Sequence, residues 1–211
     1  MSIYAQNLEK TRTLITRNQT NIEEVNQPSF WISDVKNENN QMKVKIAFQS
    51  TINWLKIVQE QGEKCSFYPV DGSDGVFRSG GLIVQDPTRF TYDWATENGV
   101  EVKNAGDCDC LLLNAKWHFI EFKTDASSTD IKQMTNNRNK GETQLAKTMT
   151  AFKESLQDDT LPCTCVLVVP KIYPKIQASL ILRGVKFQKR FDKKVQLIEV
   201  SNDGNNSYGL K

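Results

Sequence analysis

Three charged residues in the second half of the chain have types and spacing that suit metal-assisted hydrolysis. Asp109 is followed twelve positions later by Glu121, and Lys123 comes two positions after that. Two neighbouring carboxylates are tolerated when a divalent cation lies between them, and Mg²⁺ typically uses one or two protein carboxylates. A nearby lysine can orient or deprotonate a water molecule, or stabilise negative charge in the transition state. These groups together are suited to the hydrolysis of a phosphodiester.

The segments around these residues are expected to bring them together as a β-hairpin. Residues 109–113 contain a nearly continuous apolar run, and residues 117–123 are aromatic and β-branched until charge appears at the end, which favours strands over a helix. A turn of three residues between them would place Asp109 opposite Glu121, with Cβ atoms about 5 Å apart. Lys123 would then lie on the same face of the sheet as Glu121. A loop of another length would shift this register.

The pattern of Asp109 followed by Glu121, Phe122 and Lys123 resembles the motif of the PD-(D/E)XK nuclease superfamily. This superfamily includes many restriction endonucleases, junction resolvases and repair nucleases. The helix expected after the motif adds to the resemblance, because many members carry a glutamine where this chain has Gln144. The resemblance covers about residues 106–169, and it departs from the family pattern in having no proline before the aspartate.

The resemblance implies a role for each residue of the motif. Asp109 and Glu121 would hold Mg²⁺ or Mn²⁺, with the main-chain carbonyl of Phe122 as a further ligand. Lys123 would activate water or stabilise the transition state, and Gln144 would assist. Asp107 has the same strand parity as Asp109 and remains an alternative metal ligand.

The fold implied by the resemblance is an α/β fold of the restriction-endonuclease-like kind. It has three layers, α/β/α, around a central mixed β-sheet, with an N-terminal helical elaboration. We expect an N-terminal helical extension over residues 1–41, a nuclease-like domain over residues 42–200 and a flexible C-terminal tail over residues 201–211. The elements expected along the chain are a helix over 43–61, strands over 65–70, 81–85 and 100–103, a polar loop over 124–140, a helix over 142–157, a strand over 166–169, a largely helical basic segment over 171–194 that breaks at Gly184, and a strand over 195–200.

Nucleic acid, and DNA in particular, is the expected partner. The formal net charge is only +2, so local patches must supply the contacts. The residues expected to contact phosphates are Lys147, Lys171, Lys175, Lys186, Lys189 and Arg190. A solvated charged face is the alternative explanation of this basic segment. Many members of the superfamily dimerise to cut two strands, so the resemblance allows a homodimer, although no dimer seam is legible.

The composition of the chain argues against several other classes of protein. No apolar run approaches the roughly 20 residues that span a membrane, and the N-terminus lacks a signal-peptide core, so we expect a cytoplasmic protein without a membrane partner. A single histidine, His118, cannot supply the clustered histidines of zinc proteases or His-based nucleases. Five cysteines include two C-x-C pairs, Cys108/Cys110 and Cys163/Cys165, which leave a structural zinc protein as one rival hypothesis. A non-catalytic module that binds nucleic acid or protein on the same fold is the other.

Overall fold

The computed structural model describes residues 3–15, 23–36, 42–49, 54–70, 106–124, 128–158, 162–175, 177–191, 194–202 and 206–210. Within these ranges the chain forms two β-sheets and three helices, α1 (Ile3–Ile15), α3 (Ile131–Leu156) and α4 (Gln177–Phe191). The α/β class expected from the sequence is therefore confirmed. The strands expected over 81–85 and 100–103 lie outside the described residues. No helix in the described ranges has both the length and the apolar character needed to cross a membrane.

The larger sheet is mixed, as expected, and has six strands in the order β1-β5-β6-β7-β8-β9. The pairs β1–β5, β5–β6 and β6–β7 are antiparallel, whereas β7, β8 and β9 run parallel to one another. The long helices α3 and α4 supply the crossovers that parallel neighbours require. The strands are β1 (Glu23–Val25), β5 (Cys65–Pro69), β6 (Cys110–Leu113), β7 (Trp117–Phe122), β8 (Cys163–Val169) and β9 (Val195–Ser201).

The smaller sheet has four strands in the order β10-β4-β2-β3. They are β2 (Ser29–Lys36), β3 (Met42–Ala47), β4 (Leu55–Val58) and β10 (Ser207–Gly209). Strand β2 pairs antiparallel with both β3 and β4, and β10 adds parallel to β4. This sheet therefore joins an N-terminal part of the chain to a segment from near its other end.

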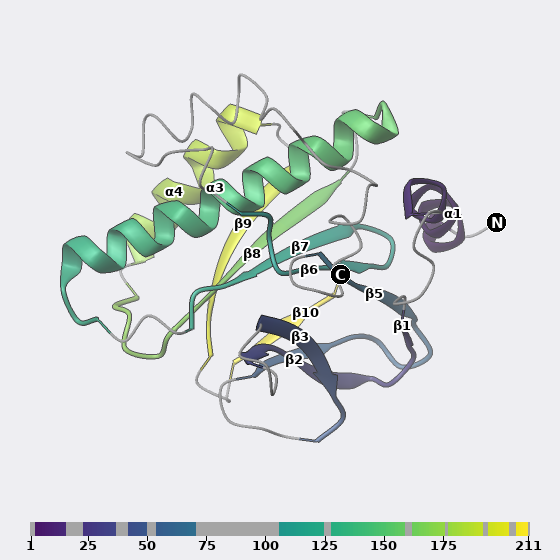
Figure 1. The fold of residues 1–211 in the computed structure, drawn as a ribbon, viewed down its shortest axis with the longest axis horizontal. Coiled ribbons are helices and arrows are strands. Elements are labelled where there is room, and N and C mark those ends of the chain that lie inside the picture. The colour runs from purple at the N-terminus through teal and green to yellow at the C-terminus, as the bar shows by residue number, and fades with distance from the viewer. Residues whose placement is uncertain are drawn as a thin grey trace.

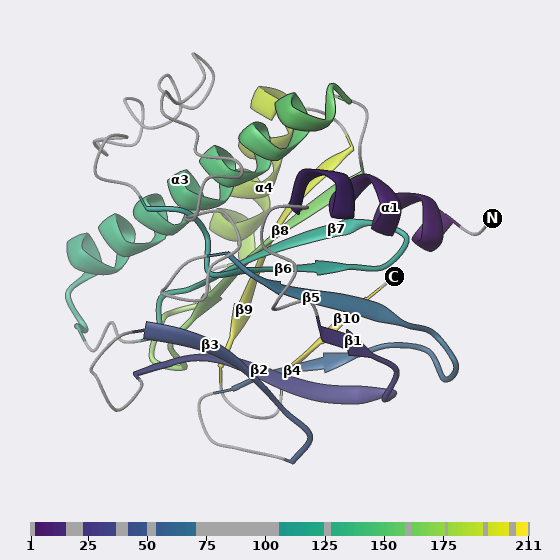
Figure 2. The ribbon, with the colours of Figure 1, turned by 45° about the vertical axis from the view of Figure 1, so that its right-hand side comes forward.

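The two faces of the six-stranded sheet are covered by different layers (Figures 1 and 2). Helices α1, α3 and α4 cover one face, where Leu145 and Phe152 of α3 pack with Leu111 and Phe119. The four-stranded sheet covers the other face. Its buried members include Phe30, Ile32, Val44, Leu55 and Ile57. The expectation of helices on both faces is therefore wrong: in the described residues the second covering layer is a sheet.

The helix expected over residues 43–61 is absent, and strands β3 and β4 occupy this region instead. Val44 is buried while Lys45 is exposed, and β4 alternates buried and half-buried residues. This period of two is typical of a strand with one face on a core. The apolar positions also fit a helical spacing, and the long-range pairing with β2 decides between the two patterns.

Both ends of the chain differ from their expected character. Residues 1–41 were expected to form a helical extension, but in the part of this range that the structure describes only α1 is helical, and β1 and β2 belong to the two sheets. The tail over 201–211 was expected to be flexible, but residues 206–210 include β10. The Leu210 N–H donates to the Val58 carbonyl (2.9 Å), and Leu210 is buried. Pairing with β4 therefore orders these residues.

The helices after the motif are longer than the sequence predicts. Helix α3 begins at Ile131, inside the expected polar loop, and Asp130 caps it by accepting a hydrogen bond from the Gln133 N–H (2.8 Å). Helix α4 continues through Gly184 without the expected break. At that position α4 lies close to the sheet, since a Cβ on Gly184 would be 3.5 Å from the Leu197 carbonyl oxygen.

Candidate active site

The hairpin that carries the motif forms as predicted. Strands β6 and β7 pair antiparallel with Leu113 opposite Trp117 and Leu111 opposite Phe119. The turn at 114–116 is closed by a hydrogen bond from the Asn114 N–H to the Lys116 carbonyl (3.1 Å), and the Asn114 side chain accepts one from the Lys116 N–H (2.9 Å). The three-residue loop that fixes this register is therefore confirmed.

Asp109 does not simply face Glu121, because the alternation of the strand is interrupted beside it. Cys108 packs in the core on the helix side together with Leu111, whereas Cys110 packs in the other core. The Asp109 N–H donates to the Ile120 carbonyl (3.0 Å), as expected when an extra residue is inserted into a ladder. The Asp109 carboxylate accepts a hydrogen bond from the Phe122 N–H (2.5 Å) and is held against the main chain of the motif.

Glu121, Lys123 and Gln144 form one hydrogen-bonded cluster. The Lys123 ammonium donates to Glu121 Oε1 and to Gln144 Oε1, the latter over 2.6 Å. Glu121 and Gln144 are buried, and the Lys123 side chain is 16% exposed. The Gln144 Nε2 group donates in turn to the Asp107 carbonyl (3.1 Å). The glutamine expected from the sequence therefore lies in direct contact with the lysine of the motif.

The charge of Lys123 is controlled by its surroundings. Burial acts to lower the pKa of Lys123, but Glu121, with smaller contributions from Asp109 and Asp34, outweighs it and raises the pKa above its ordinary value. Lys123 is therefore an ammonium group at neutral pH. Asp34 lies on β2 of the other sheet, and its neighbours of the same parity, Phe30 and Ile32, are buried against the six-stranded sheet. The sequence gives no sign that this residue belongs near the site.

Gly141 is the second residue that the sequence analysis missed. It lies on α3 above the end of β7, where a Cβ atom would be 2.5 Å from Leu167 Cδ1 and 3.3 Å from Lys123 Cγ. Only a residue without a side chain lets the helix approach this closely. The glycine therefore allows Gln144, three residues later, to reach Lys123.

Asp107 has a different environment from Asp109. Its carboxylate forms an ion pair with Lys147 of α3 (3.2 Å), and its carbonyl is the one that accepts from Gln144. Asp109, in contrast, contacts the main chain of Phe122. This arrangement favours Asp109 as the aspartate of the motif. Lys147, which was predicted to contact phosphates, is instead paired with Asp107.

The other basic residues predicted to contact nucleic acid are spread over the molecule. Because β7, β8 and β9 are parallel, their carboxyl ends lie at the same end of the sheet, and Lys123 follows β7 at this end. Lys171 and Lys175 follow β8 at the same end, and both are exposed. Helix α4 then runs back toward the start of β9, so the residues in its second half lie progressively farther from the site; these are Lys186, Lys189 and Arg190.

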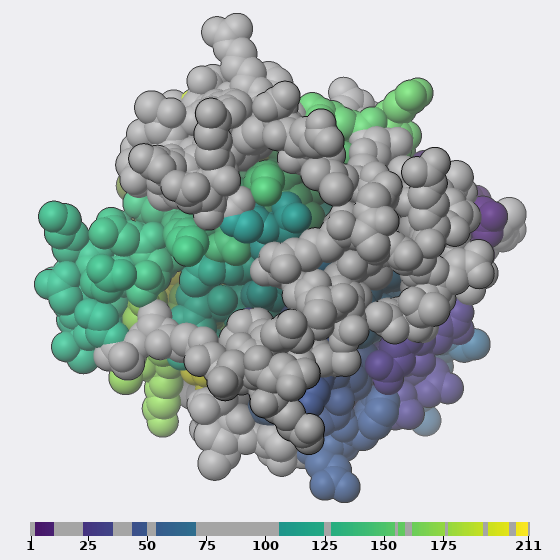
Figure 3. All heavy atoms as spheres, viewed as in Figure 1, coloured from purple at the N-terminus to yellow at the C-terminus, as the bar shows by residue number. Residues whose placement is uncertain are grey.

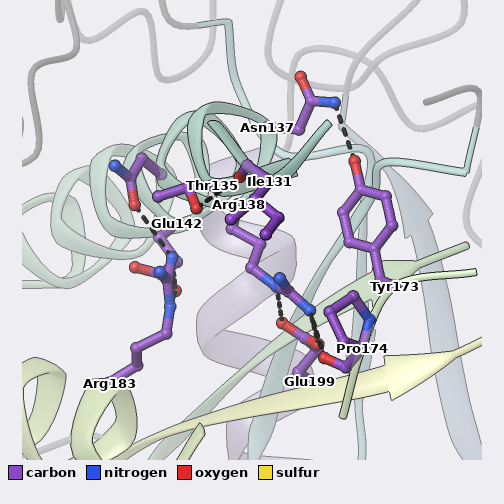
Figure 4. A network of polar contacts seen from close by, with 10 residues as sticks. Ile131, Thr135, Asn137, Arg138, Glu142, Tyr173, Pro174, Arg183 and Glu199 are labelled. Carbon is purple, nitrogen blue, oxygen red and sulfur yellow. Dashed lines mark hydrogen bonds and ion pairs between the residues drawn. The ribbon is translucent and has the colours of Figure 1, made fainter. Parts of the chain in front are cut away.

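Two further ion pairs hold α3 beside the cluster (Figure 4). Arg138 binds both carboxylate oxygens of Glu199 (2.8 and 2.9 Å), and Arg183 of α4 binds Glu142 (2.6 Å). Glu199 pairs with Leu167 in the sheet register, and Leu167 pairs with Glu121. Glu121, Leu167 and Glu199 thus form a row across β7, β8 and β9, and α3 lies over this row.

The region of the motif reaches the surface of the molecule. In the space-filling view, teal atoms, the colour of β6, β7 and the first turns of α3, are visible near the centre of this face (Figure 3).

The ligands available for a metal are oxygen atoms. The Asp109 and Glu121 carboxylates and the Phe122 carbonyl belong to adjacent stretches of β6 and β7. Across the ranges that the structure describes, no group of three or more His, Cys, Asp or Glu side chains could together hold a metal ion. Two carboxylates with a carbonyl, completed by water or phosphate oxygens, match the coordination of Mg²⁺ rather than that of zinc.

The cysteines do not form the zinc site of the rival hypothesis. All five are free and buried. Cys163 opposes Trp117 at one end of β7, whereas Cys110 opposes Ile120 near the other end, so the two C-x-C pairs lie apart. Burial raises the pKa of Cys108, Cys110 and Cys165 well above the ordinary value, which keeps these thiols protonated. They pack as small apolar side chains.

Comparison of the chain with family models, with curated proteins and with solved structures finds no match in any of the three.

Proposed function

We propose that the protein is a metal-dependent nuclease that hydrolyses phosphodiester bonds in DNA. The observation that carries the proposal is the convergence of Lys123, Glu121 and Gln144 in one cluster, with the Asp109 carboxylate on the adjoining main chain. Asp109 precedes β6, Glu121 lies on β7, Lys123 follows it and Gln144 lies on α3, so these residues are up to 35 positions apart in the numbering. The resemblance to the PD-(D/E)XK motif assigns each of them a role in the same reaction.

The donor set fits a hard divalent cation. Asp109 and Glu121 would hold Mg²⁺ or Mn²⁺, and the Phe122 carbonyl would be a further ligand. When bound, such an ion polarises a phosphoryl oxygen and lowers the pKa of a bound water. Lys123 donates to Glu121 Oε1, so the ammonium group and a metal ion would share this carboxylate, which has a second oxygen, Oε2.

Lys123 carries a positive charge at neutral pH when no metal is bound, because Glu121 raises its pKa. A metal ion on Glu121 would weaken this effect, so Lys123 would either activate water or stabilise the transition state. An ammonium group next to the reacting phosphate would stabilise the negative charge that builds up on the oxygens. Gln144 holds the ammonium from the other side and can orient it or the attacking water.

Phosphate contacts at the edge of the site would come from the exposed residues Lys171 and Lys175. Both follow β8 at the end of the sheet that also carries Lys123. Because backbone contacts position a nucleic acid without reading its sequence, we expect each lysine to contribute to affinity and to its salt dependence. Lys147 can contribute only if its ion pair with Asp107 opens.

The test is cleavage of a panel of linear, circular, single-stranded and branched DNA, with RNA alongside. Reactions contain Mg²⁺, Mn²⁺ or a chelator, and wild type is compared with Lys123→Ala and Glu121→Ala. Lys132→Ala and Glu154→Ala are matched controls, because both residues are exposed on α3. The proposal expects metal-dependent cutting that the two site variants abolish and the two controls retain. Equal trace activity in all variants would show contamination and would refute the proposal.

A non-catalytic binding module on the same fold is the second candidate. The observation in its favour is that Lys123 and Glu121 already form an ion pair with each other. Together with the contact between Lys123 and Gln144, such a pair can have a purely structural role that positions α3 against the sheet. The same panel, read by gel shift instead of cleavage, separates the two: a module of this kind binds nucleic acid without cutting it, and binding does not require a divalent metal.

A further inference from the structure

Helix α4 carries an exposed apolar face that includes none of the residues of the candidate active site. Ile181 is 65% exposed, Leu182 56% and Val185 39%, and the three lie within little more than one helical turn. Large apolar residues are scattered singly over most protein surfaces, whereas a contiguous group marks an interaction site. The only fully buried residue of α4 is Phe187, so most of the helix surface is available to a partner.

A groove lies beside this face, between α4 and β9. Its volume is about 390 Å³, and its apolar lining includes Leu180, Ile181, Leu197 and Ile198. β9 is the last strand of the six-stranded sheet in the described residues, so the groove runs along a sheet edge. A groove of this size can accept one or two side chains, which a flat surface cannot do.

The polar wall of the groove has charged side chains that are all paired. It contains Glu142, Arg183 and Glu199, and each is already paired: Arg183 with Glu142, and Glu199 with Arg138 (Figure 4). A charged group that entered the groove would therefore meet a neutralised wall. An apolar side chain would contact the leucine and isoleucine residues of the lining and would give up no hydrogen bond with water.

Outside the lining of the groove, the exposed surface of α4 is basic. The α4 sequence contains four basic residues and no acidic one. Lys186 and Lys189 are exposed on the turns that follow Val185. A partner complementary to this face has an apolar side chain for the groove and acidic side chains about one helical turn away.

This charge distribution distinguishes between the classes of partner. A second copy of the chain packed on the same face would bring the lysines of two α4 helices together, which costs energy. Nucleic acid would satisfy the lysines but leave Ile181, Leu182 and Val185 against phosphates and sugars. An anionic membrane would contact both the apolar residues and the lysines, but a flat lipid surface would not fill a groove at a sheet edge.

We propose that the α4–β9 groove binds an acidic amphipathic segment of a protein partner, with an apolar residue in the groove and carboxylates on Lys186 and Lys189. The groove adjoins the candidate active site through Leu167, which pairs with Glu121, but the proposal does not depend on nuclease activity. The apolar residues of α4 provide contact area, and the two lysines provide orientation and specificity. The assignment of Lys186 and Lys189 to a protein partner competes with their assignment to nucleic acid.

The experiment is selection of a randomised 16-residue peptide library displayed on phage against the full chain. The enriched peptides are then synthesised, and their affinity is measured by fluorescence anisotropy. We expect sequences with an apolar anchor and acidic residues within about one helical turn. Ile181→Asp and the double variant Lys186→Glu/Lys189→Glu should each weaken binding at least tenfold. Ile131→Asp, at a site on α3 that is 76% exposed, and Lys140→Glu are the matched controls and should not change it.

Several results would overturn the proposal. These are failure to enrich any peptide, enrichment of basic or uncharged sequences, and binding that the α4 variants do not weaken. Vesicles of phosphatidylcholine with phosphatidylserine are tested in parallel, and binding to them that depends on Ile181 would assign the face to a membrane. Concentration-dependent dimerisation lost in Ile181→Asp would assign it to a second copy. Each variant replaces an exposed residue, so thermal unfolding should be unchanged and serves as the check on folding.

Discussion

Gly141 of α3 lies directly on the side chain of Lys123, and a Cβ atom at this position would be 3.3 Å from Lys123 Cγ and 2.5 Å from Leu167 Cδ1. Any other residue here therefore requires the helix or the Leu167 side chain to shift. Since Gln144 on the same helix binds the Lys123 ammonium, the separation between α3 and β7 sets the geometry of the whole cluster.

Gly141→Ala should destabilise the protein even though alanine is the better helix former. The clash with Leu167 forces its side chain or α3 to shift, and overpacking of this kind costs about 1–3 kcal/mol. Gly184→Ala on α4 is the control, because its Cβ would meet only one atom, at 3.5 Å, and alanine should stabilise that helix by up to about 1 kcal/mol. Urea denaturation of the two variants measures both effects. Equal stabilisation by both would contradict the close approach at Gly141.

Lys123→Met should cost more stability than a surface lysine can. The substitution leaves the buried Glu121 carboxylate without the ammonium group, and breaking a buried pair from one side typically costs about 3–5 kcal/mol. Adding Glu121→Gln to Lys123→Met should recover most of that loss, because the uncompensated charge is gone. A double-mutant cycle by urea denaturation measures the coupling, and Lys132→Met is the exposed control. Additive effects would show that the two side chains do not interact.

Glu142 should make the protein less stable as pH rises through the acidic range. Burial raises the pKa of Glu142, and the neighbouring Arg183 offsets this only in part. An acid whose pKa is higher in the folded state costs nothing below its ordinary value of 4.5, and it costs progressively more as pH rises through the raised pKa. The free energy of unfolding of wild type relative to Glu142→Gln should therefore fall as pH rises above about 4.5. Glu154→Gln controls for the loss of one glutamate, and a difference that rises with pH would contradict the prediction.

Tyr208→Phe should destabilise the junction between the two sheets. The Tyr208 hydroxyl lies 2.7 Å from His118 Nδ1, and both residues are buried. Removing the hydroxyl leaves a buried ring nitrogen without its hydrogen bond, which costs about 1–3 kcal/mol.

The His118 imidazole of the wild-type protein should not titrate by NMR between pH 5 and 8. Burial, with a smaller effect from Lys116, lowers the pKa of His118 to about 3. Titration of His118 in that range would refute the buried arrangement.

The hairpin could be predicted because its information is local. The apolar runs, the turn and the charged ends lie within residues 106–123, and the pairing of Leu111 with Phe119 follows from them. The extra residue at Asp109 could not be predicted, because it depends on a contact with the end of β5. The Val70 N–H, one residue after that strand, donates a hydrogen bond to the Asp109 carbonyl (2.9 Å). The side chain still reaches the motif, but by a contact with the Phe122 N–H.

The second sheet was missed because its pairing is distant in sequence. Residues 43–61 satisfy a helical and an alternating pattern at once, and only contact with β2 and the larger sheet selects the strands. The same holds for the early start of α3. Its polar stretch looks like a loop until Arg138 is placed on Glu199 and Asn137 on Tyr173, contacts that span 61 and 36 positions. Asp34 and Gly141 were overlooked for the same reason.

The parallel pairing of β10 with β4 has a consequence for how the chain folds as it is synthesised. Residues 56–58 leave the ribosome roughly 150 residues before residues 207–209, so the outer side of β4 waits without its partner for most of translation. An uncovered strand edge is a template for wrong pairing. We therefore expect this edge to be where nascent chains misassociate, and where a chaperone that shields extended segments would improve the yield of folded protein.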